Sequence, residues 1–161
     1  MPTSQEVLSC LRRVYSLHFS AQSQAETGWE GMGKGVVKVT SPLENSLVFY
    51  ESGSWQPDKA NPKSAEPPPS FAFTNVFRWT AIEHRLRLEH LRFGVDKPVL
   101  LFDMEADDAG QWRELDPHLC GQDVYAASLC IEGPQIRVAW TIQGPRKQES
   151  IVYTYQMTPA A

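Results

Sequence analysis

Two segments of this chain alternate between apolar and polar residues. In residues 71–79 every odd position except Asn75 is aromatic, and in residues 135–142 every even position is apolar. A period of two puts one set of side chains on one face of a strand, which is typical of an antiparallel sheet with one covered face. Similar strand-like segments, joined by short turns, run from residue 31 to residue 157. Because so long a meander must close or cover its edges, we predict an all-β fold, an antiparallel up-and-down barrel of about eight to ten strands.

The chain of 161 residues is long enough to bury the core of one domain, and we assign residues 1–161 to a single domain. Its beginning predicts one helix over residues 3–18. Thr3 and Glu6 have the spacing of a capping box, and apolar residues recur at helical spacing from Val7 to Tyr15. We expect the apolar stripe of this helix to close one end of the barrel.

Residues 53–70 differ in composition from the rest of the chain. They hold five prolines and almost no apolar residue besides Trp55, which predicts a mobile loop inserted in a hairpin. The three consecutive prolines at 67–69 leave an alternative open, in which this loop docks on a partner protein as a polyproline II helix.

The overall composition excludes several classes of protein. The formal net charge is −4, so no basic field attracts nucleic acid. No apolar run approaches the ~20 residues of a membrane span. The first residues lack an export signal, so we expect a cytoplasmic protein. Cys10, Cys120 and Cys130 lack the spacing of a metal knuckle, so we expect free thiols and no bound metal. No phosphate-binding or dinucleotide loop is present, so we expect no cofactor. The oligomeric state stays open.

The alternation also predicts which side chains line the barrel. Aromatic residues at 77, 79, 140, 153 and 155 share strand faces with a few polar groups, an arrangement typical of a site for a small, largely apolar or amphipathic ligand. The alternative is that the same side chains fill the barrel as core. The candidate ligand-binding residues are Asn75, Phe77, Arg78, Trp79, His90, Arg92, Tyr125, Trp140, Tyr153 and Tyr155.

A second candidate cluster offers a thiol, an imidazole and a carboxylate within residues 117–125. Its members are His118, Cys120 and Asp123, with Lys147 from a later turn. Nucleophilic catalysis would need Cys120 to be deprotonated by a neighbouring base. In an extended chain His118 and Cys120 lie ~6–7 Å apart, which is too far for direct contact. We therefore favour a structural role for this segment, with an enzyme or a chromophore lyase as the alternative.

The sequence resembles a bacterial family of small lipocalin-like proteins of unknown function within the calycin group. The resemblance rests on the glycine-rich run 28–35, the Phe77-Arg78-Trp79 unit, His90, residues 117–125, Trp140, residues 144–147 and Tyr155, and its second half is the more specific. It implies an antiparallel calycin barrel and no established activity. Our leading hypothesis is a non-catalytic barrel that binds its ligand inside, with His90 and Arg78 or Arg92 orienting a polar head group.

Overall fold

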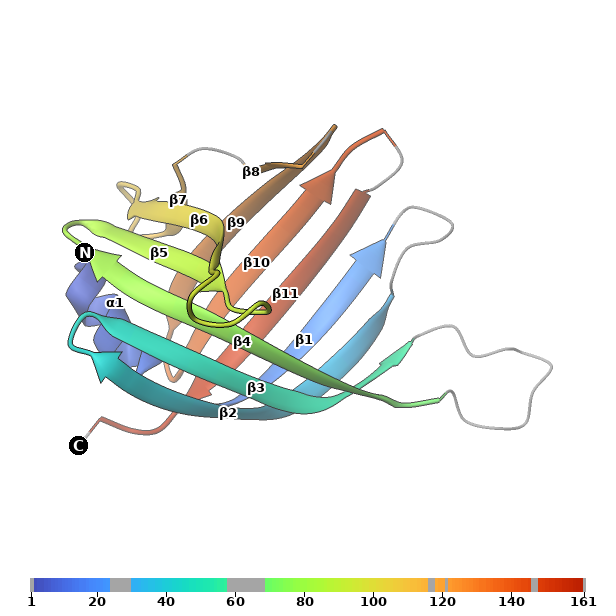
Figure 1. Cartoon of the computed structure of the whole chain (residues 1–161), viewed down its shortest axis with the longest axis horizontal. Coiled ribbons are helices and arrows are strands. Elements are labelled where there is room, and N and C mark those ends of the chain that lie inside the picture. Colours follow the sequence, from blue (N-terminus) through green and yellow to red (C-terminus); the bar gives the residue numbers. More distant parts are fainter. Residues whose placement is uncertain are drawn as a thin grey trace.

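The computed structural model describes residues 2–23, 30–57, 69–115, 118–120, 122–145 and 148–160. Strands make up most of these residues, and one short helix precedes them (Figure 1). The elements in chain order are α1 (Ser4–Leu11), β1 (Val14–Ser23), β2 (Gly31–Leu43), β3 (Ser46–Pro57), β4 (Phe71–Ile82), β5 (Arg85–His90), β6 (Val99–Ala106), β7 (Trp112–Glu114), β8 (His118–Cys120), β9 (Asp123–Glu132), β10 (Gln135–Gln143) and β11 (Gln148–Met157).

The strands form a closed antiparallel barrel. Ten of them follow one another around the ring in the order β10, β11, β1 to β7 and β9, and pairing of β9 with β10 closes it. β8 lies outside this ring and pairs with the first three residues of β9. Every pairing is antiparallel, which confirms the predicted fold class.

The register explains which side chains form the core. Paired residues share a face of the sheet, so the pairs Phe49↔Phe77 and Leu47↔Trp79 put four apolar side chains on the inside. Tyr155 joins them from β11, where it pairs with Leu17 and Ile136. The odd-numbered aromatic positions of β4 therefore face the interior, as the alternation predicts.

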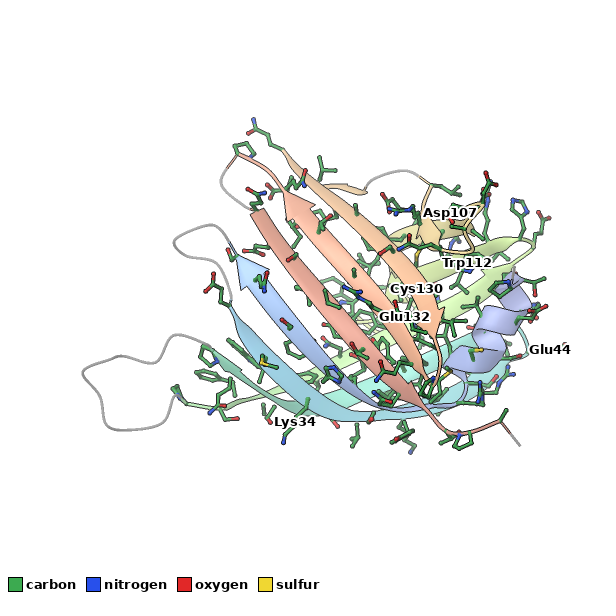
Figure 2. All side chains as sticks on the ribbon, turned by 180° about the vertical axis from the view of Figure 1, so that it is seen from behind. Lys34, Glu44, Asp107, Trp112, Cys130 and Glu132 are labelled. Atoms are coloured by element: carbon green, nitrogen blue, oxygen red, sulfur yellow. The ribbon has the colours of Figure 1, made fainter. Side chains whose placement is uncertain are left out.

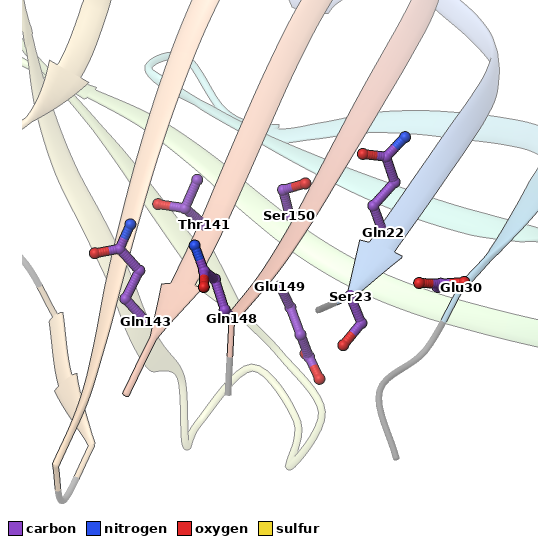
Figure 3. A pocket seen from close by; sticks show the side chains of 8 residues that line it. All are labelled: Gln22, Ser23, Glu30, Thr141, Gln143, Gln148, Glu149 and Ser150. Atoms are coloured by element: carbon purple, nitrogen blue, oxygen red, sulfur yellow. The ribbon is translucent and has the colours of Figure 1, made fainter. Parts of the chain in front are cut away.

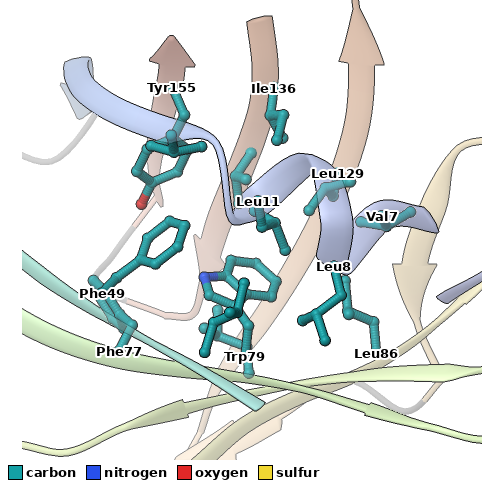
Figure 4. Close-up of a cluster of buried hydrophobic side chains, with 14 of the residues drawn as sticks. Val7, Leu8, Leu11, Phe49, Phe77, Trp79, Leu86, Leu129, Ile136 and Tyr155 are labelled. Atoms are coloured by element: carbon teal, nitrogen blue, oxygen red, sulfur yellow. The ribbon is translucent and has the colours of Figure 1, made fainter. Parts of the chain in front are cut away.

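Helix α1 closes the end of the barrel formed by the β2–β3 and β4–β5 turns. The Thr3 side chain accepts a hydrogen bond from the Glu6 amide at 3.1 Å, which caps the helix. Val7, Leu8 and Leu11 are at most 1% exposed and pack over the aromatic core (Figure 4). Among the described residues no helix is long and apolar enough to cross a membrane.

The predicted helix over residues 3–18 is wrong beyond residue 11. Residues Val14–Ser23 form β1, which pairs with β11 on one side and β2 on the other. Val14 and Leu17 are both buried, and their spacing of three mimics a helical stripe. That spacing results from a bulge between Val14 and Ser16 in the pairing with β11. Two ladders of inter-strand hydrogen bonds outweigh the weak helical pattern.

The predicted loop over residues 53–70 begins too early. β3 continues to Pro57, and its Gly53 pairs with Phe73 of β4. A Cβ on Gly53 would clash with the Lys34 carbonyl oxygen of β2, so glycine lets these two strands approach closely. β3 and β4 do form a hairpin, but residues 58–68 lie outside the described part of the chain.

Truncation of the α1 stripe tests its role as part of the core. We expect Leu11→Ala to lower the free energy of unfolding by about 2–5 kcal/mol, because a fully buried leucine leaves a cavity. Ser9→Ala, on the exposed side of the same helix, is the control and should stay within about 0.5 kcal/mol of wild type. Urea denaturation followed by circular dichroism measures both. A Leu11→Ala variant as stable as Ser9→Ala would contradict docking of the helix.

Candidate functional site

The two halves of the barrel interior differ in solvent exposure. In the half next to α1 the inward side chains are sealed, with Phe49, Trp79 and Leu88 at most 1% exposed. In the opposite half the inward side chains of Phe73, Trp140 and Tyr153 are only partly buried, although they point into the barrel. Solvent therefore reaches the inner wall of this half. We call it the open half; its strands end at the right and top of Figure 1.

Aromatic rings cover much of this inner wall. Trp140 contacts the rings of Phe102 and Phe77, with ring centroids 5.2 and 6.2 Å apart. Phe19 contacts Phe73 and Tyr153, in each case at 5.4 Å. A Cβ on Gly33 would run into the Phe19 ring, so the glycine run of β2 makes room for that ring. The wall is therefore built from large, rigid apolar rings that five strands contribute (β1, β4, β6, β10 and β11), and the glycines of β2 leave room for them.

A buried carboxyl group lies at the base of the open half. Glu51 of β3 is 2% exposed and points inward because it alternates with Phe49 and pairs with Val37 and Asn75. The Tyr155 hydroxyl donates a hydrogen bond to Glu51 Oε2 at 2.6 Å. Oε1 is also buried, and no donor makes a hydrogen bond to it.

Burial controls the ionisation of this group. It raises the pKa of Glu51 from 4.5 to about 7, while the Tyr155 hydroxyl and the nearby Asn75 amide partly oppose the rise. Burial also raises the pKa of Tyr153 and of Tyr155, and the Glu51 charge adds to both shifts. The two phenol rings stack with centroids 5.9 Å apart. Both phenols thus stay neutral near pH 7, and Glu51 is the group that changes charge there.

The predictions from sequence did not include Glu51. A signal was available, because Leu47, Phe49 and Glu51 alternate on one face of a strand whose apolar members point into the core. A carboxylate at an inward position of a strand is rare unless it has a partner. The partner, Tyr155, is 104 residues away in the sequence, and only ring closure brings the two together.

Most predicted ligand-binding residues lie on the inner wall. These are Asn75, Phe77, Trp79, His90, Tyr125, Trp140, Tyr153 and Tyr155, although Trp79 belongs to the sealed half. The His90 ring lies 4.9 Å from that of Phe77, and burial, followed by the Arg92 charge, lowers its pKa. The indole N–H groups of Trp79 and Trp140 are buried without a hydrogen-bond partner.

The two predicted arginines lie elsewhere. Arg78 alternates with the inward Phe77 and Trp79 and forms an ion pair with Glu89 at 2.9 Å. Arg92 is exposed, and its guanidinium group lies 4.8 Å from the centre of the Phe93 ring. The structure therefore does not bring either arginine together with the aromatic wall.

The second candidate cluster is only partly described. The backbones of His118 and Cys120 pair with Tyr125 and Asp123 in the β8–β9 hairpin. The Asp123 carboxylate packs against Gly144. Lys147 and the side chains of residues 118–120 lie outside the described part of the structure. Cys10 and Cys130 are free thiols, and among the described side chains no group of three or more His, Cys, Asp or Glu residues could hold a metal ion.

Pockets among the described residues lie apart from the aromatic wall, and two of them are of interest. One, of about 350 Å³, is polar and sits at the ends of β1, β2, β10 and β11 (Figure 3). The other, of about 750 Å³, lies near the chain start and includes Trp112, Cys130 and Glu132, which Figure 2 labels. Burial and then the neighbouring Glu132 raise the pKa of the Cys130 thiol, which makes it a poor nucleophile.

The fold and the site together define a class: a closed antiparallel barrel with an aromatic, solvent-reached half above a buried Glu–Tyr pair. The model of a family of unknown function (DUF6314) matches residues 12–157, and the chain belongs to this family. Comparison with curated proteins and with solved structures gave no match.

The raised pKa of Glu51 predicts how stability depends on pH. The folded protein binds this proton more tightly than the unfolded chain, so the Glu51 contribution to stability falls as pH rises from 4.5 through about 7. Gln at this position still accepts a hydrogen bond from Tyr155 and never ionises. We expect the advantage of Glu51→Gln over wild type to grow by about 2–3 kcal/mol between pH 5 and pH 8.

Urea titrations of both proteins at several pH values measure this difference. Glu44→Gln is the matched control, because it removes an exposed carboxylate in the turn close to α1 (Figure 2). If the free energies of unfolding of wild type and Glu51→Gln changed with pH in parallel, ionisation of Glu51 would not destabilise the folded protein, which would contradict this prediction.

Proposed function

We propose that this protein is a lipocalin-like, calycin-type barrel that binds a small, largely apolar ligand in its open half. The observation that carries the proposal is the partial exposure of inward aromatic side chains such as Trp140, Tyr153 and Phe73. A filled barrel would bury these rings as completely as it buries Phe49 and Trp79. Concave apolar walls with few polar groups are the common form of small-molecule sites.

The proposed site has an apolar wall and one polar end. Trp140, Phe77 and Phe19 supply ring surface for the apolar body of the ligand. Glu51 and Tyr155 supply the polar end at the base of the open half, with the Asn75 amide beside them. Arg78 and Arg92 are not part of this proposal, because one is paired with Glu89 and the other is exposed.

Binding of an uncharged apolar fluorophore tests the proposal. We expect N-phenyl-1-naphthylamine to bind with a stoichiometry of one and to gain fluorescence, and decanol to displace it. Trp140→Leu should weaken binding roughly tenfold, equivalent to about 1.4 kcal/mol, because it removes a ring from the centre of the wall. Tyr50→Leu is the matched control: it removes a ring that is 45% exposed on a position alternating with the inward Phe49 and Glu51.

Two results would contradict the proposal. The first is the lack of saturable binding by a correctly folded protein. The second is a Trp140→Leu variant that binds the probe as tightly as Tyr50→Leu, since the probe would then bind outside the barrel.

A further inference from the structure

Glu51 is a buried carboxyl group in the interior, and it bears on which ligand head groups the interior favours. Its Oε2 accepts the Tyr155 hydrogen bond. The Asn75 amide lies close enough to lower the pKa of Glu51, but no donor makes a hydrogen bond of good geometry to the buried Oε1. A buried acceptor without a partner is costly, and such groups are retained in proteins where something else satisfies them. Glu51 lies two residues before Gly53, which pairs with the partly exposed Phe73, so a ligand in the open half would lie next to this carboxyl group.

No cationic side chain of the described residues faces the interior to serve as that partner. Arg78 and Arg87 occupy the alternating positions between inward residues, and they form ion pairs with Glu89 and Asp103 at 2.9 and 2.8 Å. Lys34 is exposed on the outer surface of β2 (Figure 2). An ionised Glu51 therefore has no counter-ion inside the described part of the barrel.

The rings around Glu51 favour a positive charge as well. Phe49 and Tyr153 each pack against the Tyr155 ring, with centroids 5.6 and 5.9 Å away. The faces of aromatic rings carry negative potential and attract cations. A carboxylate head group beside Glu51 would be repelled by its negative charge, and no arginine or lysine among the described inward residues would offset the repulsion.

We propose that the ligand carries a cationic amine, and that its ammonium group binds Glu51 Oε1 at the base of the open half. The proposal rests on the proposed function and narrows it to one ligand class, a largely apolar alkyl or aryl amine. The ammonium group donates to the vacant carboxylate oxygen, while the apolar body packs along Trp140 and Phe19. Fatty acids and other apolar anions are correspondingly disfavoured.

The surroundings of Glu51 imply that amine binding depends on pH. β2 presents the apolar Val37 to it, β4 the Asn75 amide, and β11 the neutral phenols of Tyr153 and Tyr155. Other inward titratable groups of the described residues include His90 on β5, Glu114 on β7 and Tyr125 on β9, and none of these strands pairs with β3. Because the pKa of Glu51 is about 7, the affinity for an amine should increase about tenfold for each pH unit as the pH rises toward 7. Above pH 7 the affinity should change little.

Three ligands with one chain and different head groups test the proposal by titration calorimetry at pH 8. We expect decylamine to bind at least about tenfold more tightly than decanol, and decanoate to bind more weakly than decanol. At pH 6 decylamine should also release nearly one proton per molecule bound, measured in buffers of different ionisation enthalpy, because Glu51 must ionise.

Glu51→Gln should bring the affinity for decylamine to within about threefold of that for decanol, and proton release should disappear. Glu44→Gln, which changes the net charge equally at an exposed turn, should behave as wild type. Equal or tighter binding of decanoate by the wild type would overturn the amine proposal and leave ligand binding intact. Failure of all three ligands to bind would overturn the proposed function itself, and neither result depends on the variants folding.

Discussion

Closure of the strands into one ring is the constraint on which the rest of the structure depends. β1 pairs with the last strand on one side and with β2 on the other, so it joins the two ends of the chain into one ring. Once the ring is closed, one face of every strand is inside and the other is outside. That division brings Glu51 and Tyr155 together, because residues 104 positions apart then face the same interior.

The two halves of the barrel differ in how completely their inward side chains are buried. Helix α1 seals one end, and its Leu8 and Leu11 belong to the same core cluster as Trp79, each with an exposure of 1% or less. The half away from α1 keeps its rings partly exposed and therefore contributes less apolar burial per residue.

The carboxyl group of Glu51 is the main departure from an apolar interior. Burial raises its pKa to about 7, and one hydrogen bond from Tyr155 compensates for only part of the desolvation. A leucine at this position would fill the same space without that cost. Groups of this kind are frequent at functional sites, where a charge or a donor from outside completes them.

The sequence by itself determined the fold class and the facing of most wall residues. A strict period of two is a local property of a strand, so Phe77, Trp79, Trp140 and Tyr155 could be assigned to the inner wall without coordinates. Local patterns misled at residues 14–18, where a bulge gives helical spacing, because pairing with β2 and β11 decides that segment and is not visible locally. Only the tertiary structure decided which inward residues are sealed and which are reached by solvent, since that depends on where α1 docks. It also decided the hydrogen-bond partner of Glu51, and hence its pKa. Desolvation and hydrogen bonding depend on residues that the closed ring brings together, and Glu51 and Tyr155 are too far apart in the sequence for a local pattern to relate them.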